Sequence, residues 1–174
     1  MKNYEKISKE VRKLILRQTY ISSVGHTGGS LSMVEIIIAI YEFFSQKFSS
    51  DKLPRVIISK GHSAAGLYAY LAYIGHLRIE ELSSYRGYGS RTQSHVKPPS
   101  KMSPGIEGFY PSGSLTHGLS IASGIGISDK VDKNKKQPEP IFCVLGDTEL
   151  QGGQVWETAV QISFHKLNNI IAFV

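Results

Sequence analysis

The chain has 174 residues, of which 41% are hydrophobic and 20% are charged, and its formal net charge is +6. This length allows one domain with a hydrophobic core and is too short for two full domains. The composition is that of a soluble globular protein, and the basic residues are scattered without an aromatic platform, which argues against nucleic-acid binding. The basic excess fits either an ordinary solvated surface or attraction of anions such as sugar phosphates or a diphosphate.

The N-terminal residues and the single cysteine are typical of a cytoplasmic protein. Charged and apolar residues alternate over residues 1–17, unlike in a secretory signal. The most apolar run, residues 33–44, is interrupted by Glu35 and Glu42, so we expect no membrane span. Cys143 has no partner for an internal disulfide, which fits a reducing compartment.

The first half of the chain predicts helices around one short strand. Apolar residues recur at helical spacing near the N-terminus, and a β-branched run further on is typical of a buried strand. Ser30 is expected to cap the second helix. The predicted segments are a helix at 4–22, a glycine-bearing loop at 24–29, a helix from 30 to about 46, a strand at 56–58, and helices at 64–74 and 79–85.

The second half predicts two more buried strands separated by helices. It begins with a long loop rich in Gly, Ser and Pro, of the kind that is usually functional or disordered. The predicted segments are this loop at 87–111, a closely packed helix rich in small residues around 118–126, a strand at 141–145, a helix at 155–166 and a strand at 170–174.

Strands and helices therefore alternate, which predicts an α/β fold with a largely parallel sheet flanked by helices. No internal repeat or interdomain linker divides the sequence, so residues 1–174 are expected to form one domain. Because the last predicted strand is buried and C-termini usually lie on surfaces, we expect this domain to be C-terminally incomplete.

Four polar clusters fall in loops or just after predicted strands, where open α/β sheets bind their ligands. Each cluster alone has an ordinary structural explanation, such as a glycine turn, a polar strand end or a helix start. The clusters are GHTGGS at 25–30, SKGH at 59–62, GSLTHG at 113–118 and GDTE at 146–149.

These residue types suit the binding of an anion and a metal. Glycines let backbone N–H groups approach an anion, and a helix N-terminus favours negative charge. Lys60 and His62, after a strand, suit a phosphate. Asp147 at a strand end is a natural ligand for Mg²⁺, which prefers oxygen donors and diphosphate. His95, in the long loop, is either catalytic or simply exposed.

In this order and spacing, the clusters resemble the N-terminal, thiamine-diphosphate-binding region of transketolases, including the N-terminal subunits of split transketolases. The resemblance covers nearly the whole chain. The matching segments are GHTGGSLS at 25–32, SKGH at 59–62, PGIE at 104–107, GSL at 113–115, GLS at 118–120, LGD at 145–147, ELQ at 149–151, GQVWE at 153–157 and LNN at 167–169.

The resemblance implies part of a thiamine-diphosphate-binding fold and a transferase that moves a two-carbon ketol unit from a ketose phosphate to an aldose phosphate. It implies thiamine diphosphate with Mg²⁺ or Ca²⁺ as cofactors, and Asp147 as a metal ligand. His26 and His95 would face the sugar and act in catalysis. The implied cofactor contacts are His62, Gly113, Ser114, Leu115, Gly146, Asp147, Thr148 and Glu149.

The resemblance also implies that this chain is not the whole catalyst. The family's second metal ligand, an asparagine, would lie beyond Val174, and the glutamate that activates the cofactor belongs to a separate domain. We therefore expect a homodimer, or a heteromer with a C-terminal, pyrimidine-binding subunit, and no activity from the chain alone. The expected ligands are sugar phosphates, with no nucleic acid and no membrane among the partners.

Three departures from the family pattern keep an alternative open. Thr148 replaces a usual glycine, Gly152 stands where the family often has glutamate, and residues 116–117 are Thr-His in place of Gly-Gln. A degenerate, non-catalytic domain kept for assembly would also show such changes. A related thiamine-diphosphate enzyme, such as a deoxyxylulose-phosphate synthase, is a second alternative, although the segments at 25–30 and 104–107 favour the transketolase branch.

Overall fold

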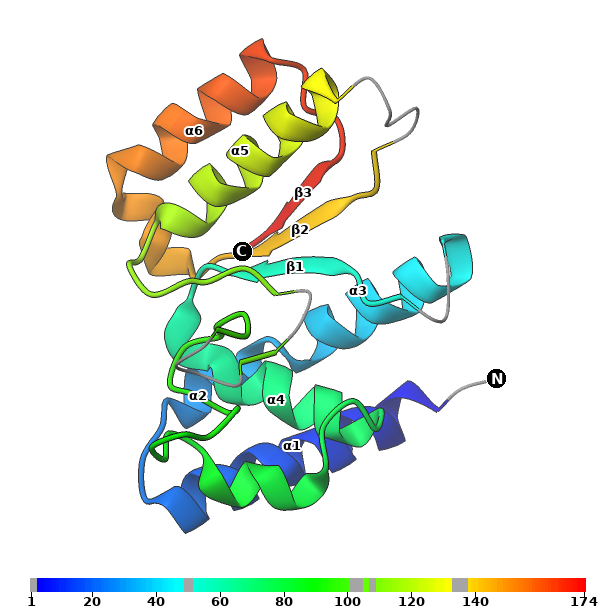
Figure 1. The fold of residues 1–174 in the computed structure, drawn as a ribbon, viewed down its shortest axis with the longest axis vertical. Coiled ribbons are helices and arrows are strands. Elements are labelled where there is room, and N and C mark those ends of the chain that lie inside the picture. Colours follow the sequence, from blue (N-terminus) through cyan, green and yellow to red (C-terminus); the bar gives the residue numbers. More distant parts are fainter. Residues whose placement is uncertain (1–2, 49–51, 101–104, 107–108, 133–137) are drawn as a thin grey trace.

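The computed structural model describes residues 3–48, 52–100, 105–106, 109–132 and 138–174. Figure 1 shows a parallel three-stranded sheet with helices on both sides, which confirms the predicted fold class. The strands are β1 (Arg55–Ile58), β2 (Ile141–Val144) and β3 (Ile170–Phe173), and they pair in the order β1-β2-β3.

The helices divide between the two sides of the sheet (Figure 1). The lower layer holds α1 (Tyr4–Ser22), α2 (Thr27–Ser32), α3 (Val34–Lys47) and α4 (Ala64–Tyr73), and the upper layer holds α5 (His117–Val131) and α6 (Gly153–Phe164). Three short 3₁₀ helices complete the fold: η1 (Gly61–Ser63), η2 (Ile79–Ser84) and η3 (Asp147–Gln151). Loop residues 87–100 contain no helix, as predicted.

Successive side chains of β1 and β2 point to opposite layers, so each strand contributes to two hydrophobic clusters. Val56, Phe142 and Val144 pack in the cluster that includes α1, α3 and α4 residues. Ile57 and Cys143 pack instead with residues of α5 and α6. Burial on both faces explains why β1 and β2 read as uninterrupted apolar runs in the sequence.

The prediction that Ser30 caps a helix running to about residue 46 was wrong. Two helices occupy this stretch, and α2 begins at Thr27, inside the predicted loop. Ser30 lies buried within α2, where its hydroxyl donates to the carbonyl of His26, four residues earlier, at 2.9 Å. A serine hydroxyl can bond to a backbone carbonyl inside a helix as well as cap one, so the sequence pattern did not separate the two cases.

The third strand was predicted to be buried, and this too was wrong. β3 is an outer strand of the sheet, and Ile171 is 37% exposed. Its neighbour on one side is β2, with Phe142 paired to Ile171.

The stretch Thr27–Lys47 is long and apolar enough to pass as a membrane span, contrary to the sequence-based expectation. It spans α2 and α3, and in this fold Ile37, Ile40 and Phe44 of α3 are each 1% exposed. A core helix of a soluble protein satisfies the same criterion of length and composition, so this is weak evidence for a membrane.

Candidate functional site

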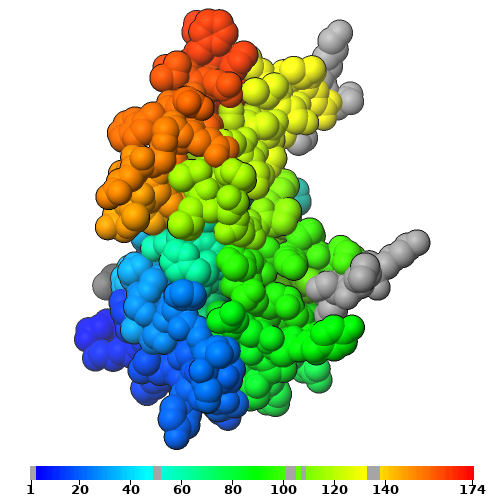
Figure 2. Space-filling model, turned by 90° about the vertical axis from the view of Figure 1, so that its left-hand side faces the viewer, coloured from blue at the N-terminus to red at the C-terminus, as the bar shows by residue number. Residues whose placement is uncertain are grey.

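The four sequence clusters come together at the edge of the sheet where β1 and β2 end. Figure 2 looks onto this face, where light-blue, teal, green, yellow-green and orange parts of the chain meet. η1 follows β1, η3 follows β2, and the start of α5 is hydrogen-bonded to Ser59 at the end of β1 and, through Thr116, to Glu149 of η3. Parallel strands bring their carboxyl ends to one edge, which is why segments far apart in sequence share this face.

A buried carboxylate ties these segments together. Glu149 is 3% exposed. Its Oε1 accepts hydrogen bonds from the Ser59 hydroxyl and the Thr116 backbone N–H, both at 2.6 Å. Its Oε2 accepts from the Gly146 N–H at 2.7 Å. One side chain therefore holds the end of β1, the end of β2 and the loop before α5 in fixed relation.

Helix α5 starts unusually close to the end of β1. The Gly118 N–H donates to the Ser59 hydroxyl at 3.2 Å. A Cβ built on Gly118 would lie 2.5 Å from Ser59 Oγ and 2.7 Å from Ser59 Cα, inside any real contact distance. The predicted close packing of this glycine-bearing helix is thus confirmed at Gly118.

Three histidines from separate segments meet at η1, which itself contains His62. The rings of His26 and His62 meet edge to face, with their centroids 5.1 Å apart. His95 packs on Gly61, since a Cβ there would lie 2.6 Å from His95 Cδ2. The Ser94 hydroxyl and His95 Nδ1 share a hydrogen bond of 3.2 Å. The structure therefore brings together both predicted catalytic histidines and the predicted cofactor contact His62.

Burial and neighbouring groups lower the pKa of two of these imidazoles. Burial lowers the pKa of His62 below 6.5, and His26 and Lys60 lower it further. Burial likewise lowers the pKa of His95, with added effects of Arg86 and Lys97. Neutral imidazoles can both donate and accept hydrogen bonds.

These lowered pKa values predict that acid destabilises the fold. The unfolded chain takes up protons on His62 and His95 near pH 6.5, whereas the folded chain resists until lower pH. The contribution is therefore complete above pH 6.5 and is lost as pH falls through the folded-state pKa values. The melting temperature measured from pH 8 to pH 5 should fall less in the variant His62→Gln/His95→Gln than in the wild type. Parallel curves for the two proteins would contradict this assignment.

The remaining predicted contacts lie on the exposed side of the same edge. Gly113, Ser114, Leu115, Asp147 and Thr148 are exposed, and Gly146 is half-buried. Lys60 is 8% exposed, and its ammonium donates to the Ser32 hydroxyl at 3.0 Å. Burial lowers the pKa of Lys60, while Asp147 and Glu149 act in the opposite direction. The Lys60 ammonium is thus close enough to the carboxylates of Asp147 and Glu149 for their charges to affect its pKa.

If Asp147 binds a metal, the ion needs further ligands that the neighbouring side chains in the described ranges do not supply. Among the residues that the structure describes, no three His, Cys, Asp or Glu side chains are placed to hold one ion. Pro104 and Glu107 of the predicted PGIE motif lie outside the described residues, whereas Gly105 and Ile106 are buried.

Two serine hydroxyls at this edge are buried without a partner in the described part of the chain, which the sequence does not indicate. The Oγ atoms of Ser63 and Ser112 are buried and have no hydrogen-bond partner among the described residues. Ser112 directly precedes the predicted contact Gly113, and a Cβ on Gly61 would lie 3.0 Å from its hydroxyl. Unpaired buried hydroxyls are costly unless a further group bonds them. Serines in a Gly- and Pro-rich loop give no sequence signal for this.

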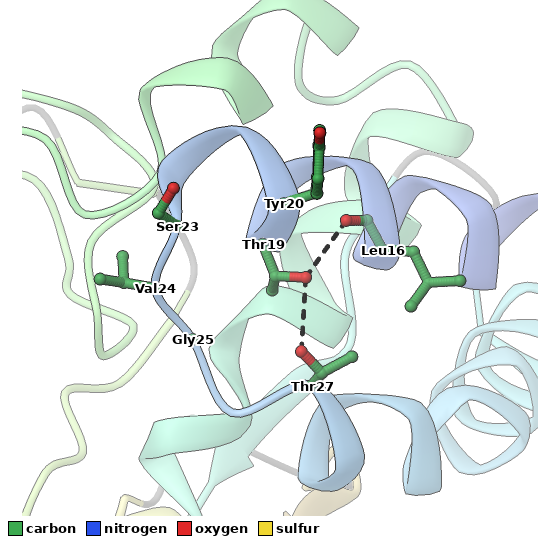
Figure 3. A pocket seen from close by; sticks show the side chains of 7 residues that line it. All are labelled: Leu16, Thr19, Tyr20, Ser23, Val24, Gly25 and Thr27. Atoms are coloured by element: carbon green, nitrogen blue, oxygen red, sulfur yellow. Dashed lines mark hydrogen bonds between the residues drawn. The ribbon is translucent and has the colours of Figure 1, made fainter.

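A cavity of about 490 Å³ flanks the loop that carries His26. Its lining side chains, drawn in Figure 3, come from the end of α1 and the loop into α2. Thr19 and Thr27 face each other there, with a hydroxyl–hydroxyl hydrogen bond of 3.4 Å. The contact ties the end of α1 to the start of α2 and so fixes the loop on either side of His26.

Comparison with known proteins agrees with this geometry. Residues 4–174 match the family described as transketolase, thiamine diphosphate binding domain. The chain is 34% identical over 168 residues to the 6-deoxy-6-sulfo-D-fructose transketolase subunit SqwG of Clostridium sp. (strain MSTE9), covering 94% of this chain and 58% of that protein. It is 33% identical over 177 residues to one subunit of the apulose-4-phosphate transketolase of Actinobacillus succinogenes, covering 97% of this chain and 62% of that protein.

A solved structure gives the same result. The transketolase from Campylobacter jejuni superposes with a TM-score of 0.78 at 25% identity, over 99% of this chain and 28% of that chain. The chain thus spans about six-tenths of the two curated relatives and a smaller share of this transketolase. Fold, motif order and family match agree: this chain belongs to the transketolase family, as its thiamine diphosphate-binding region.

Proposed function

We propose that this chain binds Mg²⁺ and thiamine diphosphate at the carboxyl edge of its sheet and, with a partner, transfers a ketol unit between sugar phosphates in the cytoplasm. The observation that carries the proposal is the meeting of His26, His62 and His95 at η1, on the same edge of the sheet where Asp147 follows β2. The family match to a thiamine diphosphate-binding domain supports the cofactor.

The residues at this edge fit a diphosphate and its metal. Asp147 supplies an exposed carboxylate, and diphosphate oxygens would provide the further donors that Mg²⁺ prefers. Lys60 brings a positive charge, and the unpaired Ser112 hydroxyl next to Gly113 offers a donor. The side chain of Thr148 is exposed rather than packed into the protein, so it lies where a ligand would approach.

Bound thiamine diphosphate supplies the carbanion and electron-sink chemistry, and the protein's task is to bind and orient. In this proposal His26 and His95 hydrogen-bond sugar hydroxyls and hold or pass protons near neutral pH. The matched relatives are named as transketolase subunits. A partner, either a second copy or a C-terminal pyrimidine-binding chain, is accordingly part of the proposal.

Asp147→Asn tests the cofactor site. The variant keeps the size of the side chain and removes its charge, so affinity for Mg²⁺ and thiamine diphosphate should fall on the order of a hundredfold. The measurement is calorimetric titration of the protein purified with its native partner. Glu10→Gln on α1 removes a carboxylate far from this edge and should bind like the wild type. Equal affinities of the Asp147 variant and the wild type would refute the site.

A ketol-transfer assay on the same assembly separates the alternatives. Consumption of a ketose phosphate that depends on thiamine diphosphate and an aldose phosphate would support the transketolase proposal. Cofactor binding without turnover would point to another sugar pair or to a related thiamine-diphosphate enzyme. Absence of cofactor binding would favour the degenerate assembly domain.

A further inference from the structure

Two of the positions that depart from the family pattern are in direct contact. A Cβ built on Gly152 would lie 2.5 Å from Thr116 Cγ2 and 3.3 Å from the Glu149 carbonyl oxygen. The backbone of Gly152, with φ −85° and ψ 126°, is open to any residue. Glycine is therefore required at position 152 for space, and the group that takes the space is the methyl of Thr116.

Thr116 itself adopts an unusual backbone conformation. Its φ is 73°, in the left-handed region that β-branched residues rarely occupy. Such a conformation persists only where surrounding contacts hold it. Two hydrogen bonds do so here: the Thr116 N–H donates to Glu149 Oε1 at 2.6 Å, and the Thr116 hydroxyl donates to Gln154 Oε1 at 3.2 Å.

The hydroxyl of Thr116 begins a polar chain that joins α5 to α6. Gln154 Nε2 donates to the Ser120 hydroxyl at 3.1 Å. Ser120 and Thr158 share a hydroxyl–hydroxyl bond of 2.8 Å, and Thr158 donates back to the Gln154 carbonyl at 2.7 Å. Thr116, which follows the exposed loop 113–115, is thus bonded to the buried carboxylate of Glu149 and to Gln154 of α6, and Gln154 in turn bonds Ser120 of α5.

We propose that Thr116 is a positioning residue that fixes the loop 113–115, and that Thr116 and Gly152 function as a single unit. The Thr116 methyl fills the volume that a side chain at position 152 would occupy, and its hydroxyl anchors the loop to Gln154. The departures from the family pattern at positions 116 and 152 therefore compensate each other in volume. Such matched changes argue against the alternative of a degenerate, non-catalytic domain. The steric coupling between Thr116 and Gly152 does not depend on any assigned function, whereas the role of Thr116 in cofactor binding rests on the function proposed above.

A double-mutant cycle on the melting temperature tests the coupling. Thr116→Ser keeps the hydroxyl and removes the methyl that Gly152→Ala would strike. In the wild type, Gly152→Ala should lower the melting temperature by about 3 °C or more, because the added methyl overpacks the site. In the Thr116→Ser background, the same change should be neutral or raise the melting temperature, since alanine restricts the unfolded chain. Equal shifts in both backgrounds would overturn the coupling.

Cofactor affinity tests the positioning role. Thr116→Val keeps the shape of the side chain and removes the hydroxyl, so the bond to Gln154 is lost. With the native partner present, this variant should bind thiamine diphosphate roughly tenfold more weakly, whereas Thr116→Ser should bind within about twofold of the wild type. Equal binding by the two variants would overturn the positioning role. A wild type that binds no cofactor would defeat the proposed function, and the melting-temperature cycle would still decide the coupling.

Discussion

Replacing Glu149 by alanine should lower the free energy of unfolding by about 3–5 kcal/mol, the largest loss of stability expected from the substitutions considered for this chain. The carboxylate is 3% exposed and accepts hydrogen bonds from Ser59, Thr116 and Gly146. Alanine would leave all three donors without this acceptor and would create a cavity where the carboxylate was. Urea unfolding followed by circular dichroism measures the change.

Two further substitutions separate hydrogen bonding from simple loss of charge. Glu149→Gln keeps one acceptor oxygen and sets an amide nitrogen against one of the donors, so it should cost about 1–3 kcal/mol. Glu157→Gln, on the exposed side of α6, should change stability by less than about 0.5 kcal/mol. If Glu149→Ala were as mild as Glu157→Gln, the carboxylate would not be the link between the two strand ends.

The second large effect is expected at Gly118. An added methyl would lie 2.5 Å from Ser59 Oγ and 2.7 Å from Ser59 Cα, and the latter is backbone that cannot swing away. Gly118→Ala should therefore cost about 3 kcal/mol, with displacement of the serine that bonds Glu149.

Gly124 provides the matched control on the same helix. A Cβ there meets nothing within 4 Å, so Gly124→Ala should stabilise α5 by about 0.5–1 kcal/mol. The two variants make the same chemical change in one helix and should move the urea midpoint in opposite directions. A shift of the same sign and size in both would show that α5 is not pressed against β1.

Much of the fold was predictable because its signals are local. The apolar runs that form β1 and β2 are buried on both faces, and alternation of strands and helices indicated parallel pairing. The family resemblance implied that His26, His62 and His95 serve one site, and the structure brings these three side chains together. Local pattern could not decide between a cap and an internal bond for Ser30, because both use the same hydroxyl.

Other features of the site depend on contacts that no local pattern encodes. Glu149 follows a common Gly-Asp turn, and only the meeting of β1, β2 and α5 makes it a buried acceptor. Thr116 and Gly152 look like separate departures in the sequence, and their relation emerges only from the fold, where a Cβ at position 152 would lie 2.5 Å from the Thr116 methyl. β1 and β3 are both outer strands of the sheet, yet β1 is largely buried and β3 is partly exposed, and their apolar sequences do not distinguish the two cases.

The hydrogen bond between Ser59 and Glu149 has a consequence for how the protein is made, because it joins residues 90 positions apart in the chain. During synthesis β1 leaves the ribosome long before its partner β2 exists, and its apolar faces and strand edges stay unpaired in the meantime. The lower helices can associate early through contacts within the first half of the chain, whereas pairing of β1 with β2 must close a long loop and is slow. The part of this edge that is built from α5, β2 and η3 is therefore among the last parts of the nascent chain to assemble.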